Sequence, residues 1–199
     1  MRRPPVSAAL AVAAAVALAP SVAAAGGKRT ARDVRCDSRD AVTLLASEEA
    51  RLFRVREFPG FRWACATGRR RPLWLLQRPV GEDADVAVTG RYVTFTSRDE
   101  GCSSGQCVGP VSYIVNVRSR RERRLAATAA ISMRADGTYA AVQIQPTDDI
   151  RRPIRRIVFV TETGTRVLDE SPDIDSTSLV SRGRRLYWVD AGVAQTAVI

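Results

Sequence analysis

Histidine is missing altogether from this chain of 199 residues, and its absence removes whole classes of chemistry. Without an imidazole there is no Ser-His-Asp or Cys-His catalysis, no histidine-ligated zinc and no histidine pH sensor. Lysine is nearly missing too, because Lys28 is the only one. One lysine near the N-terminus argues against Schiff-base chemistry and Walker-type phosphate binding. The signals that remain concern export, fold and binding.

The N-terminal segment has the composition of an export signal. Arg2 and Arg3 precede an alanine-rich apolar stretch over residues 6–18, and residues 23–25 are the three small residues of a signal-peptidase site. Pro20 ends this apolar stretch. The stretch is also shorter than the roughly 20 residues of a membrane-spanning helix. We therefore expect residues 1–25 to be a signal peptide cleaved near Ala25, and the mature protein to be secreted.

A hairpin pattern recurs along the rest of the chain. Gly90, Gly137 and Gly183 lie 47 and 46 residues apart, each between two stretches that alternate apolar and polar residues, and a weaker copy covers residues 44–55. Glycine supplies the positive φ of a tight turn, and alternation sends every second side chain to one face of a strand. Each hairpin is followed by a third strand, a polar turn and a fourth strand. Four short strands per 40 to 50 residues are typical of propeller blades.

The sequence therefore predicts an all-β fold. We expect a small β-propeller-like array of about four four-stranded blades over residues 41–199, preceded by an N-terminal arm over residues 26–40. The last repeat has room for only three strands. Its missing outer strand would come from residues 28–40 or from a partner chain in an edge-paired dimer, or the array stays open as a monomer. A β-sandwich with accidental spacing is the alternative fold.

The residues around two of the turns resemble a known repeat family. The sequences Gly-Arg-Tyr-Val-Thr-Phe over residues 90–95 and Ala-Asp-Gly-Thr-Tyr over residues 135–139 are similar to turns of TolB-type and Trp-Asp-like β-propeller repeats, found in many secreted actinobacterial proteins of unknown role. The resemblance covers residues 41–199, without the family's Trp-Ser-Pro and Trp-Asp signatures. It implies a propeller fold and a tendency to bind, and it carries over no catalytic residue.

Four cysteines in an exported chain indicate two disulfides. Cys102 and Cys107 bracket a short polar loop, so we expect them to pair with each other. Cys36 would then pair with Cys65 and fasten the N-terminal arm to the first blade. With no histidine and no Cys-x-x-Cys motif, the cysteines argue against a metal or redox site, and no cofactor is expected.

The loops that join the second and third strands of each blade are expected to emerge on one face. Three of the four are elongated, and binding residues concentrate on such loops. They are equally well explained as tolerated surface insertions. The candidate binding residues on this face are Phe58, Phe61, Asp99, Glu100, Asp148 and Asp149.

Arginine-rich turns are expected on the opposite face of the array. The chain carries a net charge of +10, and arginine binds phosphate and carboxylate groups in bidentate fashion. An arginine bias in composition, with ordinary solvated side chains, is the alternative reading. The candidate binding residues here are Arg120, Arg121, Arg123 and Arg124.

Together these features favour a secreted, non-enzymatic binding or scaffold module. Its expected partner is an anionic cell-envelope polymer or another protein. The alternative function is an extracellular, glycan-active hydrolase that uses only carboxylates, because 21 acidic residues supply many possible carboxylate pairs.

Overall fold

A computed structural model of the protein describes residues 30–74, 85–97, 102–103, 106–107, 109–149 and 152–199. The expected signal peptide lies outside these residues. In the described part, the 3-10 helix η1 (Ala31–Asp33) precedes strands that form four small antiparallel sheets and one separate two-stranded hairpin. The prediction of an all-β array of short-stranded blades is therefore confirmed. The alternative fold, a β-sandwich of two packed sheets, is not observed in this part of the chain.

Each sheet is built from consecutive segments of the chain, apart from the small hairpin inserted in the second. The first sheet contains β1 (Ala41–Ala46), β2 (Ala50–Val55), β3 (Phe58–Ala66) and β4 (Leu73–Trp74). The second contains β5 (Asp85–Thr89), β6 (Tyr92–Ser97), β9 (Val111–Asn116) and β10 (Arg121–Leu125), and the hairpin is β7 (Cys102–Ser103) with β8 (Gln106–Cys107). The third contains β11 (Thr128–Met133), β12 (Tyr139–Gln145), β13 (Ile154–Val160) and β14 (Thr165–Ser171). The last contains β15 (Val180–Arg182), β16 (Arg185–Asp190) and β17 (Val193–Val198).

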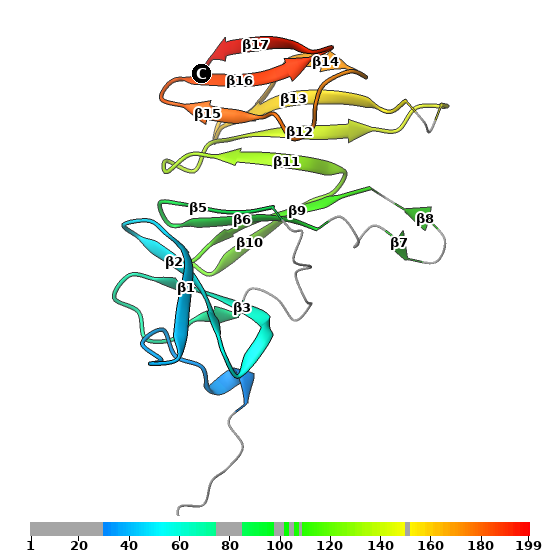
Figure 1. Ribbon diagram of the computed structural model, residues 1–199. Coiled ribbons are helices and arrows are strands. Elements are labelled where there is room, and N and C mark those ends of the chain that lie inside the picture. Colours follow the sequence, from blue (N-terminus) through cyan, green and yellow to red (C-terminus); the bar gives the residue numbers. More distant parts are fainter. Residues whose placement is uncertain (1–29, 75–84, 98–101, 104–105, 108, 150–151) are drawn as a thin grey trace, which may run out of the picture.

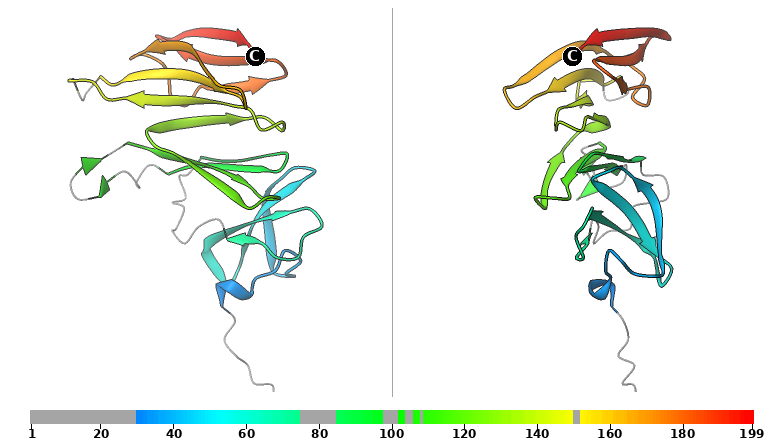
Figure 2. Two further views of the ribbon diagram at one scale, coloured as in Figure 1. Left: turned by 180° about the vertical axis from the view of Figure 1, so that it is seen from behind. Right: turned by 90° about the vertical axis from the view of Figure 1, so that its left-hand side faces the viewer.

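The sheets stack face to face in chain order along the molecule (Figures 1 and 2). Between the first two sheets, Leu52 packs in one cluster with Val93 and Phe95. Between the third and fourth, Val142 and Trp188 share another. Because each apolar face meets only the next sheet, the core is a series of layers and not a single centre.

The predicted alternation after each glycine turn is confirmed by burial. The residues three and five positions beyond each glycine are all at most 5% exposed. Tyr187, which lies between two of them, is 40% exposed, as expected when successive side chains point to opposite faces. The buried residues are Val93, Phe95, Ala140, Val142, Leu186 and Trp188.

The glycine turns also connect one sheet to the next. The Ser47 hydroxyl donates a hydrogen bond to the Gly90 carbonyl at 2.5 Å. Further along, the Arg134 guanidinium donates to the Gly183 carbonyl at 2.6 Å. Between these two contacts, Gly90 of the second sheet lies close to Ala135 of the third. The turns therefore position each sheet against its neighbour at one end of the array.

The array is open, because the first and last sheets lie at opposite ends of the molecule (Figure 1). The last sheet has three strands, as predicted. Residues 30–40 do not complete it. They lie against the first sheet, where Val34 and Cys36 are buried with Phe53 and Trp63. The option that the N-terminal arm supplies the missing strand is therefore wrong, and the reason is that its apolar residues cover the otherwise exposed face of the first sheet.

Candidate functional site

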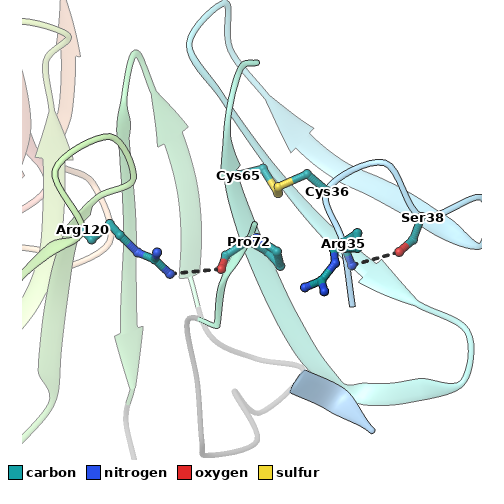
Figure 3. Close-up of a disulfide and its surroundings, with 6 residues drawn as sticks. All are labelled: Arg35, Cys36, Ser38, Cys65, Pro72 and Arg120. Atoms are coloured by element: carbon teal, nitrogen blue, oxygen red, sulfur yellow. Dashed lines mark hydrogen bonds between the residues drawn. A yellow bond between two sulfur atoms is a disulfide. The ribbon is translucent and has the colours of Figure 1, made fainter. Parts of the chain in front are cut away.

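A disulfide fastens the N-terminal arm to the first sheet. Cys36 and Cys65 are bonded with their Cα atoms 5.9 Å apart, which confirms the predicted pairing (Figure 3). The Cys36 amide also donates a hydrogen bond to the Arg70 carbonyl at 3.0 Å. The arm therefore has a fixed position beside the β3–β4 connection, although its described part, residues 30–40, contains no strand.

Three separate segments meet beside this disulfide and enclose a cavity of about 360 Å³. One wall is the arm, the second is the first sheet with its β3–β4 connection, and the third is the turn between β9 and β10. Trp63, which is only 1% exposed, contributes the buried part of the lining. We call this cavity the arginine pocket, and its lining residues are Ala31, Arg32, Val34, Arg35, Trp63, Arg71, Pro72 and Arg120.

The β9–β10 turn carries Arg120 to the pocket in an unusual backbone conformation. Its φ is +63°, a left-handed value that costs a non-glycine residue of the order of 1 kcal/mol. The Asn116 side chain holds the turn by accepting hydrogen bonds from the amides of Arg118 and Ser119, each at 3.0 Å. The Arg120 guanidinium then donates to the Pro72 carbonyl at 3.4 Å (Figure 3). This contact joins the second sheet to the rim of the pocket.

The pocket has a strongly positive lining. Arg32, Arg35, Arg71 and Arg120 are all exposed, and none of the described residues that line the cavity is acidic. Asp33, the acid next to Arg32, accepts hydrogen bonds from Thr30. The ion pairs recorded elsewhere, Arg134–Asp136, Arg152–Asp173 and Arg156–Glu170, involve other arginines. Four cations around one cavity, without a carboxylate among its described lining residues, favour an anionic ligand.

Of the four arginines predicted on this side of the molecule, only Arg120 lines the pocket. The others lie in β10, an outer strand, and their side chains alternate between its two faces. Arg123 lies over the Tyr139 ring of the next sheet, 5.6 Å from its centroid. Arg124 points to the opposite face. Arg121, Arg123 and Arg124 therefore do not form one patch with Arg120, although all are exposed.

The aromatic residues predicted for the opposite face are not in an exposed loop. β2 ends at Val55 and β3 begins at Phe58, so the β2–β3 loop is short and both phenylalanines lie in β3. Phe58 and Phe61 are half-buried, with ring centroids 6.2 and 6.1 Å from that of Trp63. Their expected place in the loop is therefore wrong, because they extend the aromatic cluster under the arm, and their role in binding stays a prediction.

The structure describes only some of the remaining predicted site residues. Asp148 and Asp149 are exposed in the loop between β12 and β13, at the end of the sheets away from the arginine pocket. Asp99 and Glu100 lie outside the described residues. The backbones of Cys102 and Cys107 pair directly across the β7–β8 hairpin, but their side chains also lie outside the description. Their disulfide stays a prediction.

A second, larger cavity of about 720 Å³ runs along β5, β11 and β15, which are the first strands of the second, third and fourth sheets. Its charged residues neutralise each other, because Arg134 and Asp136 lie 3.4 Å apart as an ion pair. Burial by itself would raise the pKa of Asp136, but hydrogen bonds from Thr138 and the charge of Arg134 hold it below its ordinary value. This groove therefore lacks the uncompensated charge of the arginine pocket.

Two further observations apply to the described residues alone. Nowhere in them do three or more His, Cys, Asp or Glu side chains group as ligands for a metal ion. The helical part of the same residues contains no segment of the length and apolar character needed to cross a membrane.

Comparisons with known proteins leave the family open. No protein-family model matches the chain, and no curated protein matches it by sequence. A solved structure described as the β-propeller domain of the Trilobed protease from Pyrococcus furiosus, with an open velcro topology, aligns with a TM-score of 0.40 and 16% identity. The alignment covers 53% of this chain and 33% of that one.

Sequence reasoning missed Arg32 and Arg35 as site residues. Both lie in the arm, which was assigned only an anchoring role. The predicted Cys36–Cys65 bond was the one signal that placed them near the first sheet. Nothing local in the sequence indicates that Arg120, which follows them by more than eighty residues, meets them across the same cavity.

Proposed function

We propose that this protein is a secreted, non-enzymatic binding module for an anionic polymer of the cell envelope, and that the arginine pocket holds the polymer. The observation that carries the proposal is the meeting of four arginines from three segments at one cavity, with no acid among the described lining residues. Guanidinium groups bind phosphate and carboxylate oxygens with two parallel hydrogen bonds, so a cluster of them suits repeated anionic groups.

The strain and anchoring around the pocket support a binding role. Arg120 adopts a left-handed φ, and such outliers concentrate where function requires a fixed side chain. The disulfide holds Arg32 and Arg35 in place before any ligand arrives, which reduces the entropy lost on binding. The remaining exposed arginines add a long-range positive field that attracts a polyanion.

Export of the protein belongs to the same proposal. The N-terminal segment has the composition of a signal peptide, and the Cys36–Cys65 disulfide is typical of proteins in oxidising compartments. Cleavage near Ala25 removes only two arginines from a chain with a net charge of +10, so the secreted protein stays basic. Outside the cell, polymers with phosphate or carboxylate groups are the partners that such a protein attracts most strongly.

The proposal is tested with linear polyphosphate as the probe. We expect the secreted chain to bind fluorescently labelled polyphosphate, as measured by anisotropy. Replacing Arg35, Arg71 and Arg120 by glutamine should weaken binding by about tenfold or more. If four arginines neutralise four phosphates, wild-type affinity should fall by about fiftyfold between roughly 50 and 200 mM salt, and the variant should show a shallower dependence.

A matched variant controls for net charge. Arg182, Arg184 and Arg185 are exposed on the last sheet, far from the pocket, and their replacement by glutamine removes the same three charges. This variant should bind polyphosphate with an affinity within about threefold of wild type. Equal losses in both variants would contradict the pocket and leave only a general charge effect. Shortening of the polymer during the assay would favour the hydrolase alternative.

A further inference from the structure

A single residue, Asn116, holds most of the turn between β9 and β10. The turn consists of residues 117–120, between the end of β9 and the start of β10. The Asn116 side chain accepts hydrogen bonds from the amides of Arg118 and Ser119, each at 3.0 Å. The Asn116 carbonyl accepts a third bond, from the Arg120 amide, at 2.8 Å. Three of the four amides in the turn are therefore bonded to one residue.

The first residue of the turn fastens it to the core. The Val117 amide donates a hydrogen bond to the Arg91 carbonyl in the β5–β6 turn, at 2.9 Å. Val117 is 5% exposed and belongs to the apolar cluster between the first two sheets. One end of the turn is therefore fixed by the core and the rest of it by Asn116. Because all four amides have a partner, the turn is held in one conformation.

The same turn places an arginine where glycine is the usual residue. Arg120 has a φ of +63°, in the left-handed region that glycine adopts without steric cost. In the corresponding turn of the first sheet, between β3 and β4, the left-handed residue is Gly68, with a φ of +76°. A residue with a side chain keeps such a conformation only where its surroundings fix it. The three hydrogen bonds to Asn116 supply that constraint.

The backbone conformation of Arg120 decides where its side chain goes. Within the described part of the chain, the guanidinium makes one hydrogen bond, the 3.4 Å contact with the Pro72 carbonyl (Figure 3). This distance is longer than that of a strong hydrogen bond, so the contact holds the side chain only weakly. A guanidinium has five N–H donors, and most of those of Arg120 stay available to a ligand. The turn, and not the contact with Pro72, therefore directs Arg120 to the pocket.

We propose that Asn116 is a positioning residue of the arginine pocket. It holds the β9–β10 turn in the conformation that presents Arg120 to the anionic groups of the polymer, although it is not among the described residues that line the cavity. The inference rests on the proposed function, because it assigns Asn116 a part in binding the same ligand. Asn116 acts before the ligand arrives, since a side chain that starts from a fixed backbone loses less conformational entropy on binding.

The test compares variants of Asn116 and Arg120 for polyphosphate binding, measured by anisotropy. Arg120→Gln removes one exposed charge contact and should lower the affinity about fivefold. Asn116→Ala keeps the guanidinium but releases the turn, and should lower the affinity about threefold or more. The double variant should bind within about twofold of Arg120→Gln, because Asn116 has no effect once the guanidinium is gone.

Salt dependence is a readout that a loss of stability alone would not change. If four arginines neutralise four phosphates, loss of one contact should lower the salt dependence of the affinity by about a quarter, equally in Asn116→Ala and Arg120→Gln. Thr161→Ala is the matched control. In the corresponding turn of the third sheet, between β13 and β14, the Thr161 hydroxyl accepts a hydrogen bond from the Thr163 amide at 3.3 Å. This variant also loses a side-chain bond to a turn, but its affinity should stay within about twofold of wild type.

The outcomes separate this inference from the proposed function. If Arg120→Gln loses affinity and Asn116→Ala does not, the pocket stands and the role of Asn116 is wrong. Losses that multiply in the double variant would also overturn it, because Asn116 would then act independently of Arg120. A wild type that does not bind polyphosphate would overturn the proposed function and this inference with it. If Asn116→Ala fails to fold by circular dichroism, Asn116→Gln decides the outcome, because it keeps the amide but is too long to bond the adjacent amides of the turn.

Discussion

Two of the glycines in the repeated turns are required for different reasons. Gly137 has a φ of +99°, and a Cβ added to it would lie 2.7 Å from the Tyr92 hydroxyl oxygen of the preceding sheet. Gly183 has a φ of +59°, but a Cβ there would meet no atom within 4 Å. The first glycine therefore serves both the turn and the contact between sheets, and the second serves the turn alone.

Gly137→Ala is expected to destabilise the protein more than Gly183→Ala. Both substitutions place a Cβ in a left-handed backbone conformation, which costs about 1–2 kcal/mol. Gly137→Ala also forces Tyr92 to move. We expect thermal denaturation to show a melting temperature for Gly183→Ala that is several degrees below wild type, and a further decrease for Gly137→Ala.

A double variant separates the two contributions. In a background of Tyr92→Phe the hydroxyl is gone, so Gly137→Ala should cost close to what Gly183→Ala costs. The difference between the two backgrounds is the coupling between Gly137 and Tyr92. No difference would mean that the close approach at Gly137 does not contribute to stability.

At the scale of single elements, the sequence predicts what short-range patterns control. The hairpins at Gly90, Gly137 and Gly183 form as expected, because a turn glycine and alternating strands are local properties. Phe58 and Phe61 were predicted to lie in the loop before the third strand, but β3 already begins at Phe58. Their packing on Trp63 depends on the arm, which lies more than twenty residues earlier.

The arginine pocket was beyond sequence reasoning for the same reason. Alternation tells which side chains of a strand share a face, but not which sheet lies beside that face. Arg121, Arg123 and Arg124 are adjacent in sequence to Arg120 and diverge from it on β10. Arg32 and Arg35 are distant in sequence and meet it across the cavity.

Removing the disulfide should affect both stability and binding. Replacing Cys36 and Cys65 by alanine opens a loop with a sequence separation of 29 residues, which corresponds to about 3–4 kcal/mol of stability in the chain-entropy description. Arg32 and Arg35 would then lose their fixed position. We expect a lower melting temperature and weaker polyphosphate binding, by about tenfold.

The other cysteine pair provides the control for this experiment. Replacing Cys102 and Cys107 by alanine changes a hairpin at the end of the sheets away from the pocket, so polyphosphate affinity should stay within about twofold of wild type. A Cys36–Cys65 variant that binds as tightly as the wild type would show that the arm does not contribute to the pocket.

At the scale of the whole molecule, the open array gives its two ends different properties. The first sheet is covered by the arm, which buries Val34 and Cys36. In the described part of the chain no such segment covers the last sheet, and Val180, Tyr187 and Val198 are exposed on it. The first sheet therefore packs against both the arm and the second sheet, whereas the last sheet packs against the third.

Salt separates the charge of the pocket from the charge of the whole molecule. Polyphosphate binding depends on attraction between arginines and phosphates, so added salt weakens it. The variant in which Arg182, Arg184 and Arg185 are replaced by glutamine keeps all four pocket arginines. We therefore expect its affinity, measured by anisotropy, to fall as steeply as that of the wild type between roughly 50 and 200 mM salt. An equally shallow salt dependence in this variant and in the pocket variant would mean that net charge, and not the pocket, controls binding.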